Sequence, residues 1–283
     1  MIAAIVVLTL VQQFADLAAT SGGRVGICVQ AVEGGAPQEL NGSERFPMQS
    51  VYKLPISLAV LDAVDRGTLT LGQKVRLTAK DMADVHFHSP LHDKYPDGGI
   101  DISVRDLIRA AIVDSDGVAS DALFRLAGGG TRITGYLRAA GIRDMDVVAT
   151  EREMFADRTR MTQYRNSATP RAAVALLRAL YEGRGVSPAA RQLLLQDLTD
   201  SVPGPKRLKG LLPPGTPVAH KTGTDGTFDG VTRATNDIGI ITLPDGRHLA
   251  IAVFVRDSTA DESTRERTIA TAARLAFDAW MKP

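Results

Sequence analysis

The sequence predicts an α/β protein of the α+β kind, in which an antiparallel sheet is interrupted by a large helical insertion. Three observations support this fold class. Stretches rich in valine and isoleucine alternate in polarity near both ends of the chain, apolar residues show helical spacing through most of its middle, and an Asp-Gly turn joins two C-terminal strands. Strands joined by tight turns pair antiparallel, so we expect one sheet built from both ends of the chain.

The sheet and its covering helices follow from these patterns in chain order. The expected strands are 24–32, a short strand after Gly34-Gly35, 218–224, 238–243 and 248–255. Asp245-Gly246 is typical of a tight hairpin turn between the last two of them. A helix over 10–19 precedes the first strand, and a closing helix begins at the Ser263-x-x-Glu266 pattern, which is typical of a helix start. The sequence therefore predicts five strands.

The insertion shows helix start signals with a physical cause. Its expected helices are 50–66, 103–113, 118–127, 131–140, 169–182 and 187–198. Ser103 with Asp106 is close to a capping box, and Thr169 and Ser187 each precede a proline, whose missing N–H costs nothing at a helix start. We therefore predict a discontinuous sheet domain, residues 10–45 and 200–283, a helical domain, residues 46–199, and a functional site in the cleft between them.

Composition limits the classes of function. The 283 residues are 44% hydrophobic and 23% charged, which is typical of a globular protein with one or two domains. The 33 Lys+Arg and 32 Asp+Glu leave a formal net charge of +1, so no basic excess points to nucleic acid or to an anionic membrane. The single cysteine, Cys28, excludes an internal disulfide and a multi-cysteine metal site.

The N-terminal segment is apolar but short. Met1 to Val11 cannot span a bilayer, which takes about 20 residues. The segment resembles the apolar region of an export signal, although no Lys or Arg precedes it and no small-x-small cleavage site ends it. We interpret residues 1–9 as the remnant of an atypical or truncated signal. The alternative is the first turns of a helix that continues through Leu17.

A Ser-x-x-Lys pair, Ser50 and Lys53, lies where a polar loop gives way to the first helix of the insertion. At this spacing both side chains lie on one helix face. A serine hydroxyl becomes a good nucleophile when a nearby base takes its proton, and a lysine can serve as that base if its pKa is depressed. The free N–H groups of the helix start favour an oxyanion. The pair alone is unspecific, because a capping serine beside a solvated lysine has the same pattern.

Three further motifs occur in the order that this chemistry needs. They are Ser115-Asp116-Gly117 in the insertion, Glu151 with Glu153 in the irregular stretch 150–167, and Lys221-Thr222-Gly223-Thr224 on a strand. Taken singly, the Ser-Asp-Gly motif is typical of a turn, the two glutamates of solvated charge in a polar loop, and the Lys-Thr-Gly-Thr motif of a strand end.

Together the four motifs resemble the class A serine β-lactamases, and most closely their PER-like, extended-spectrum subgroup. The resemblance covers the chain from about Leu10 onward and includes the stretches 46–51, 205–213, 220–224 and 235–241, with 150–167 similar to the family's Ω-loop. It implies the fold shared with penicillin-binding proteins. In that fold an antiparallel five-stranded sheet flanked by helices packs beside an all-helical domain, and the active site lies in the cleft between them.

The resemblance implies these catalytic roles. Ser50 attacks the lactam carbonyl and is acylated. Lys53, hydrogen-bonded to Ser50, and Glu151, acting through a water, are rival bases for that step, and Glu151 is the base that hydrolyses the ester. Ser115 relays a proton to the departing lactam nitrogen, and Lys221 beside it keeps the local potential positive.

The resemblance also implies how substrate binds. Backbone N–H groups of Ser50 and Thr224 form the oxyanion hole. The substrate carboxylate meets Thr222, Thr224 and Arg207 beside Gly223, and His88 stands at the cleft mouth. The implied partner is a small-molecule β-lactam, with no nucleic acid, no membrane in the mature form, no cofactor and no metal. The implied protein is a monomer, periplasmic or secreted.

Two positions depart from the family pattern. Gly117 replaces an asparagine expected to bind the acylamino carbonyl of the substrate, so we expect weaker binding of such substrates and a roomier cleft. Phe155 replaces the asparagine that often holds the hydrolytic water. We therefore expect Glu151 and Lys53 to hold that water between them, with slower deacylation.

Three other readings compete with a β-lactamase. A D-Ala-D-Ala peptidase or penicillin-binding protein shares the serine and lysine elements but lacks a base equivalent to Glu151. A non-hydrolysing penicilloyl sensor would acylate and never turn over. A zinc hydrolase could use His86, His88 and His92, although no acidic residue follows them at a spacing that a zinc site needs.

Overall fold

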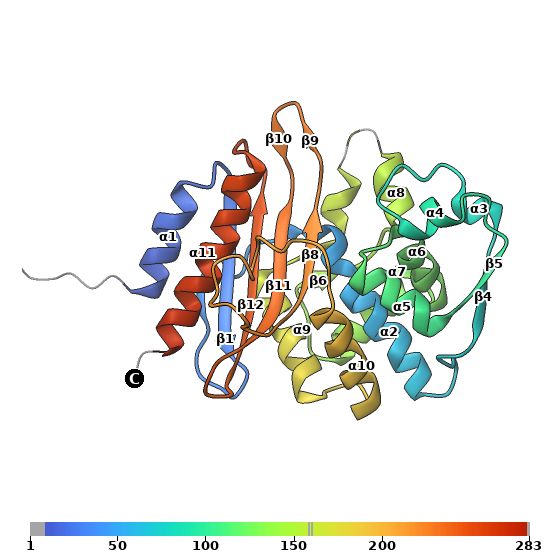
Figure 1. Ribbon diagram of the computed structural model, residues 1–283, viewed down its shortest axis with the longest axis horizontal. Coiled ribbons are helices and arrows are strands. Elements are labelled where there is room, and N and C mark those ends of the chain that lie inside the picture. The colour runs from blue at the N-terminus through green and yellow to red at the C-terminus, as the bar shows by residue number, and fades with distance from the viewer. Residues whose placement is uncertain (1–8, 158, 160, 282–283) are drawn as a thin grey trace, which may run out of the picture.

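The computed structural model describes residues 9–157, 159 and 161–281, so nearly all of the expected signal remnant lies outside it. Its centre is a five-stranded antiparallel sheet, as predicted from the sequence (Figure 1). The strands, in spatial order, are β2 (Gln38–Leu40), β1 (Arg24–Ala31), β12 (His248–Arg256), β11 (Thr235–Thr242) and β8 (Val218–Thr224). N-terminal and C-terminal strands therefore share one sheet, and β8 is its edge on the side of the insertion.

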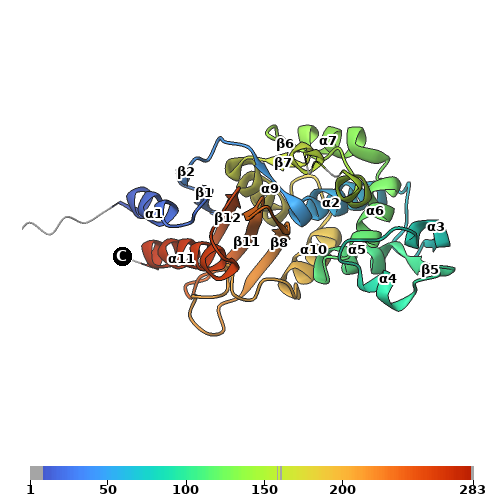
Figure 2. The same cartoon turned by 90° about the horizontal axis from the view of Figure 1, so that it is seen from above.

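Helices cover both faces of this sheet. The helices α1 (Leu10–Ala19) and α11 (Glu262–Met281) lie on one face, and α9 (Pro170–Glu182) lies on the other (Figure 2). Successive residues of a strand point to opposite faces, so β1 contributes to two cores. Ile27 joins the core under α1 and α11, whereas Cys28, the next residue, joins the core under α9. This alternation explains the apolar run in β1.

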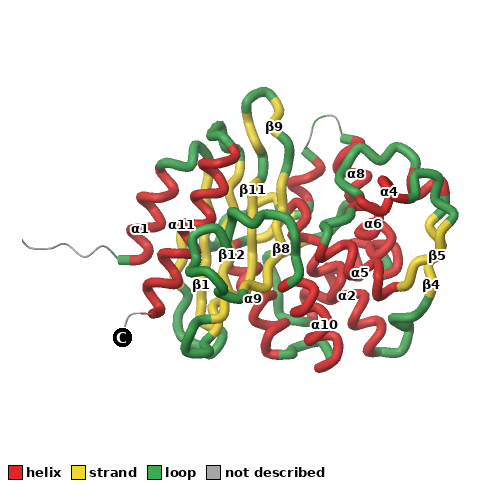
Figure 3. Tube along the Cα trace, in the orientation of Figure 1, coloured by secondary structure: helices red, strands yellow, loops and turns green. Residues whose placement is uncertain are grey.

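The rest of the molecule is mainly helical, as Figure 3 shows. Its helices are the 3₁₀ helix η1 (Gln49–Tyr52), α2 (Lys53–Asp65), α3 (Ala79–Met82), α4 (Pro90–Lys94), α5 (Val104–Val113), α6 (Gly117–Leu126), α7 (Gly129–Ala139), α8 (Glu151–Ala156), η2 (Thr162–Arg165) and α10 (Pro188–Thr199). The predicted caps are confirmed, since Ser103, Thr169 and Ser187 each accept a backbone N–H of the following turn.

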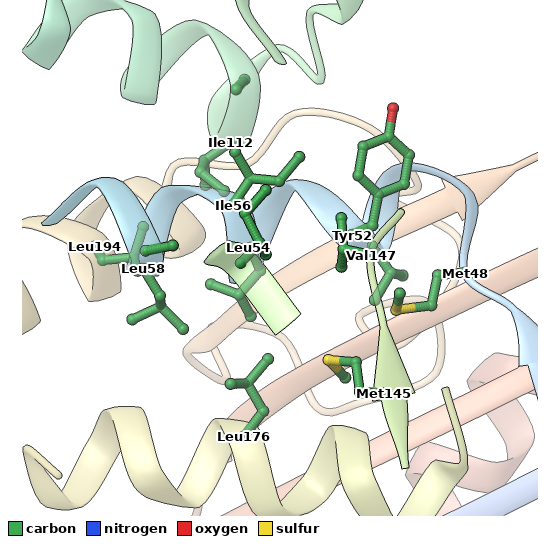
Figure 4. Packing of buried hydrophobic residues seen from close by; sticks show 14 of the residues in the cluster. Met48, Tyr52, Leu54, Ile56, Leu58, Ile112, Met145, Val147, Leu176 and Leu194 are labelled. Carbon is green, nitrogen blue, oxygen red and sulfur yellow. The ribbon is translucent and has the colours of Figure 1, made fainter. Parts of the chain in front are cut away.

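Helix α2 is the centre of this half. A helix that is apolar all round is buried on every side, and α2 is buried continuously from Lys53 to Leu61. Figure 4 shows Leu54 and Leu58 of α2 packed towards Leu176 of α9 and Leu194 of α10, with Tyr52 at the start of the helix. The residues that precede α2 are therefore held between the sheet and the helical core.

Several short strands were not predicted from the sequence. They are β3 (Phe46–Pro47), β4 (Lys74–Leu77), β5 (Ile100–Ser103), β6 (Met145–Asp146), β7 (Ser167–Ala168), β9 (Thr227–Phe228) and β10 (Val231–Thr232). Segments of two to four residues are too short to show a periodicity, and most of them pair with partners far away in the sequence. The β9–β10 hairpin follows β8 and projects beyond the sheet (Figure 1).

One strand boundary was predicted wrongly, and the difference bears on the site. Strand β11 begins at Thr235, not at Ile238, because its first three residues are polar and the apolar alternation does not reveal them. Thr235, Asn236 and Asp237 are all fully buried and pair with Thr224, Gly223 and Thr222 of β8.

Across the described residues, no helix is long and apolar enough to cross a membrane.

Candidate active site

Ser50 lies in the 3₁₀ turn η1, which continues directly into α2. Two contacts hold the segment before it against the sheet. Asn236 Nδ2 of β11 donates to the carbonyl oxygens of Pro47 and Met48, at 2.8 and 3.1 Å. Strand β8 comes so close that a Cβ on Gly223 would lie 2.2 Å from the Met48 carbonyl oxygen. The glycine of the Lys-Thr-Gly motif is therefore needed to bring the edge strand beside Ser50.

Lys53 is buried beside two acceptors. Its Nζ donates to the Ser115 carbonyl oxygen at 2.6 Å and lies 3.3 Å from Glu151 Oε2. The side chain is only 1% exposed. Among the described residues no hydrogen bond joins Lys53 Nζ to Ser50 Oγ, which differs from our expectation. The ammonium is directed to the Ser115 carbonyl and to the Glu151 carboxylate instead.

Glu151 is the first residue of α8 and is buried in the same site. Its carboxylate Oε2 accepts a hydrogen bond from the Tyr52 hydroxyl. The backbone N–H groups of Glu151 and Arg152 donate to Asp121 Oδ1 and Oδ2, at 2.7 and 3.2 Å. The described residues contain no cis peptide bond, so the peptide between Glu151 and Arg152 is trans. Glu151 is thus positioned by α6 through its backbone and by η1 through its side chain.

Two neighbours of Glu151 hold their protons more tightly than usual. Burial, and then the charge of Glu151, raises the pKa of Asp121 to about 7. Burial and the charges of Glu151 and Asp121 raise the pKa of Tyr52 well above its ordinary value. Tyr52 therefore stays protonated and remains a hydrogen-bond donor to Glu151 at any pH of interest.

Ser115 lies between the two lysines. Its backbone has φ of +59°, a left-handed conformation, and its side chain is buried. Lys221 Nζ donates to Ser115 Oγ at 2.9 Å and to the Thr222 carbonyl oxygen at 3.1 Å. Burial, and then repulsion by Lys53, lowers the pKa of Lys221 well below its ordinary value. Ser115 therefore contacts Lys53 of the helical half through its carbonyl oxygen and Lys221 of the sheet through its hydroxyl.

Arg207 is present in the site but is turned inward. Its Nη1 donates to the carbonyl oxygens of Gly223 and Asn236, its Nη2 donates to Thr224 Oγ1 at 2.8 Å, and its Nε lies 3.3 Å from Glu266. The residue is 4% exposed, whereas Thr224 is exposed. The direct contact between Arg207 and the substrate carboxylate that the resemblance implied is therefore not open in this arrangement, because both Nη atoms of Arg207 already donate to protein oxygens.

The expectation of a roomier cleft at Gly117 is wrong, because the ring of Phe87 fills that space. A Cβ on Gly117 would lie 2.4 Å from Phe87 Cδ2 and 3.1 Å from Glu151 Cγ. The Phe87 ring also contacts the Phe155 ring, with centroids 5.6 Å apart. The two departures from the family pattern are thus linked, since Phe87 touches both.

His88 lies at the surface beside this aromatic pair, where a gate residue was expected. It is exposed, and its Nε2 is 2.9 Å from the Asp114 carbonyl oxygen. Its own carbonyl oxygen accepts the Gly117 N–H at 3.0 Å. Concerning the zinc alternative, the part of the chain that the structure describes holds no group of three or more His, Cys, Asp or Glu side chains placed to bind a metal ion.

The sequence did not reveal four residues that shape this site. Phe87 and Tyr52 look like ordinary core aromatics in the sequence. Asp116 is fully buried and accepts hydrogen bonds from Ser89 Oγ and from backbone N–H groups of two neighbouring helices, whereas the sequence suggested only a turn. Asp121 gave the clearest missed signal, because it is a carboxylate in a predicted helix whose other residues are mostly apolar, and a buried carboxylate needs a specific partner.

The fold and the site define a class of protein. A serine at a helix start, two buried lysines and a buried carboxylate, gathered at the edge of a five-stranded antiparallel sheet, form a serine hydrolase site of the β-lactamase type. Comparison with known proteins agrees with this class. The family model for the β-lactamase enzyme family matches residues 9–280.

Individual relatives cover most of the chain. The extended-spectrum β-lactamase PER-1 of Pseudomonas aeruginosa is 40% identical over 258 residues, which are 91% of this chain and 83% of that protein. The β-lactamase VEB-1 of the same organism is 34% identical over 260 residues, 91% of this chain and 86% of that protein.

Solved structures are equally similar. A β-lactamase from Chitinophaga pinensis has a TM-score of 0.92 at 41% identity, covering 96% of this chain and 99% of that chain. The TLA-3 extended-spectrum β-lactamase has a TM-score of 0.93 at 38% identity, covering 96% and 98%. The chain belongs to the β-lactamase enzyme family, as a class A serine β-lactamase.

Proposed function

We propose that this protein hydrolyses β-lactam antibiotics, and so gives resistance to them, through a covalent acyl-enzyme on Ser50. Membership of the class A β-lactamases supports the activity. One observation carries the proposal: a buried carboxylate, that of Glu151, lies 3.3 Å from Lys53 Nζ beside the serine. A protein that only acylates, such as a peptidase-like penicillin-binding protein or a penicilloyl sensor, has no need of this second base.

In the proposed acylation, Ser50 Oγ attacks the lactam carbonyl carbon and loses its proton to a base. Lys53 is one candidate for that base and Glu151, acting through a water, is the other. The oxyanion that forms is stabilised by the backbone N–H groups of Ser50 and Thr224, each worth about 3 kcal/mol in comparable sites. The close packing of Gly223 against Met48 supports this pairing, because it draws β8 towards η1.

The lactam nitrogen must gain a proton when its bond to carbon breaks. Ser115 is the proposed donor, and Lys221 Nζ, 2.9 Å from Ser115 Oγ, resupplies that hydroxyl. In deacylation Glu151 takes a proton from a water, the resulting hydroxide attacks the ester carbonyl, and the proton passes to Ser50 Oγ as the ester bond breaks. Acylation therefore ends with Ser50 Oγ in the ester bond, and deacylation ends with Ser50 protonated again.

Substrate binding is proposed to fall mainly to the sheet edge. Thr222 and the exposed Thr224 hydrogen-bond the substrate carboxylate beside Gly223, in the positive potential of Lys221. Arg207 contributes its charge and orients Thr224 Oγ1 through the 2.8 Å hydrogen bond. On the opposite side of the cleft, His88 and the backbone at Gly117 line the entrance.

We further propose the organisation that the resemblance implies. Residues 10–45 and 200–283 form the sheet domain and residues 46–199 the helical domain, with 150–167 as the Ω-loop. Helix α9, which belongs to the range 46–199, packs on the sheet and so joins the helical domain to the sheet domain. The protein is proposed to act as a monomer in the periplasm or outside the cell, with a β-lactam as its only partner.

The test follows the acyl-enzyme by intact mass spectrometry. We expect the parent to turn over a penicillin, a cephalosporin or both with a transient adduct, Ser50→Ala to form no adduct, and Glu151→Gln to form an adduct that persists. Hydrolysis by Ser50→Ala would refute the covalent route. A permanent adduct on the parent would favour the sensor, and release of D-Ala from a D-Ala-D-Ala peptide with poor β-lactam turnover would favour the peptidase.

A further inference from the structure

The two oxygens of the Glu151 carboxylate have different surroundings. Within the described residues, both contacts of this carboxylate are made by Oε2, which accepts from the Tyr52 hydroxyl and lies 3.3 Å from Lys53 Nζ. Oε1 is left for another donor. A base that must take a proton from a water needs one oxygen directed at that water and a fixed orientation for the other.

Tyr52 is well placed to fix that orientation. It is fully buried in the core at the start of α2, between the nucleophile and Lys53 in the sequence. Figure 4 shows its ring standing away from Met145 and Leu176, with the hydroxyl at the far end. Burial keeps this hydroxyl protonated, as its raised pKa indicates, so it acts as a fixed donor.

No side-chain amide on α8 shares this task. Residue 155, one turn after Glu151, is a phenylalanine whose ring packs against Phe87. Lys53 is shared, because its Nζ also donates to the Ser115 carbonyl oxygen at 2.6 Å. The Tyr52 hydroxyl is therefore the one neutral side-chain donor that the described residues direct at this carboxylate.

We propose that Tyr52 is a positioning residue for deacylation, whose hydroxyl holds Oε2 of Glu151 so that Oε1 is presented to the hydrolytic water. This inference rests on the proposed function and deepens it. Tyr52 keeps its own proton throughout, and only the water, Glu151 and Ser50 exchange protons as the ester bond breaks. With Lys53 as the base for acylation, the hydroxyl acts on the ester hydrolysis step and leaves the attack on the lactam unchanged.

The test is Tyr52→Phe, which removes one oxygen and keeps the ring in the core. Losing a hydrogen bond to a charged group corresponds to roughly a tenfold loss of rate or more. We expect the rate constant for loss of the acyl adduct, followed by quenched mass spectrometry after rapid substrate removal, to fall about tenfold. Slower deacylation lowers kcat and KM together wherever it limits turnover, so kcat/KM should stay within about twofold.

Two variants make the result decisive. Tyr181→Phe is the matched control, because it removes the hydroxyl that contacts His248 Nε2 at 2.9 Å in another part of the molecule, and it should clear its adduct as the parent does. Glu151→Gln sets the lower limit for the rate constant of adduct loss. If Glu151→Gln accumulates adduct while Tyr52→Phe clears it at the parent rate, the role of Tyr52 is refuted and the proposed function stands.

Other outcomes are equally clear. A fall in kcat/KM as large as the fall in the deacylation rate would show a general loss of site structure and would overturn the specific role of Tyr52. If Glu151→Gln itself clears adduct at the parent rate, the proposed function fails first. Melting temperatures of all variants within a few degrees of the parent would exclude unfolding as the cause.

Discussion

The helical side and the sheet side of the site surround their buried lysines differently. On the helical side the Lys53 ammonium has a carboxylate, Glu151, within 3.3 Å, and a tyrosine hydroxyl supports the same carboxylate. On the sheet side Lys221 Nζ, equally buried, donates within the described part of the chain only to neutral oxygens of Ser115 and Thr222. A carboxylate thus contacts the lysine directly on one side, whereas on the other side Asp237 and Glu151 act on Lys221 without an ion-pair contact among the described residues.

This difference indicates a division of labour. A paired lysine and carboxylate can exchange protons with water and serine without a change of net charge, which suits the chemical steps. A buried ammonium with no carboxylate in direct contact is destabilised, so we expect the sheet side to favour the carboxylate of a substrate. Arg207 adds a second cation behind Thr224 on that side.

The largest expected effect separates the two lysines. Lys221→Gln should lower kcat/KM roughly a thousandfold for a substrate that carries a carboxylate. For the methyl ester of the same substrate the loss of kcat/KM should be smaller by a factor of at least about ten, because the ester has no charge to bind. Lys53→Gln should affect acid and ester to the same extent. Steady-state kinetics of both variants on both substrates test this, and equal losses for Lys221→Gln would remove the distinction between the two sides.

The next effect compares one glycine from each side. A Cβ on Gly223 would meet the backbone oxygen of Met48 at 2.2 Å, whereas a Cβ on Gly117 would meet the ring of Phe87 at 2.4 Å. Backbone beside Ser50 has little room to move, so Gly223→Ala should lose activity about a hundredfold. Gly117→Asn should lose about tenfold, since overpacking typically costs about 1–3 kcal/mol.

A second substitution sharpens this contrast. Phe87→Ala should restore most of the activity and melting temperature of Gly117→Asn, because it vacates the space that the new side chain needs. It should do nothing for Gly223→Ala. A single Gly117→Asn variant that is as stable and as active as the parent would show that the Phe87 ring can move aside at little cost in free energy.

The smallest expected effect concerns stability against pH. The pKa of Asp121 is raised to about 7, so between about pH 4 and pH 7 the folded state binds a proton that the unfolded state has lost. This carboxyl therefore makes stability fall as pH rises through that window. Lys221, whose pKa is lowered, has the opposite trend at higher pH, because there the unfolded state holds the extra proton.

Urea unfolding of the parent and of Asp121→Asn across this range measures the carboxyl contribution. The variant should show a flatter fall in the free energy of unfolding from pH 4 to pH 7 than the parent. Asp97→Asn, at an exposed residue, is a suitable control and should keep the parent slope. Parallel curves for the parent and Asp121→Asn would contradict the raised pKa.

Much of the architecture could be predicted because its signals are local. Alternation gave β1, β8 and β12 almost to the residue, and serine or threonine before a helix gave the starts of α5, α9 and α10. Four short motifs in order, together with the longer stretches that flank them, identified the family. Each of these signals lies within a few neighbouring residues, where periodicity and capping act.

The chemistry within the site was decided by contacts that the sequence separates widely. The sequence alone determined which groups we propose for the reaction, among them a serine, two lysines and a glutamate. Only the tertiary structure decided that Lys53 contacts Ser115, 62 positions away, that Tyr52 contacts Glu151, 99 positions away, and that Phe87 fills the space beside Gly117. Such partners are set by how the sheet edge, α2 and α8 pack together, and packing depends on the whole chain.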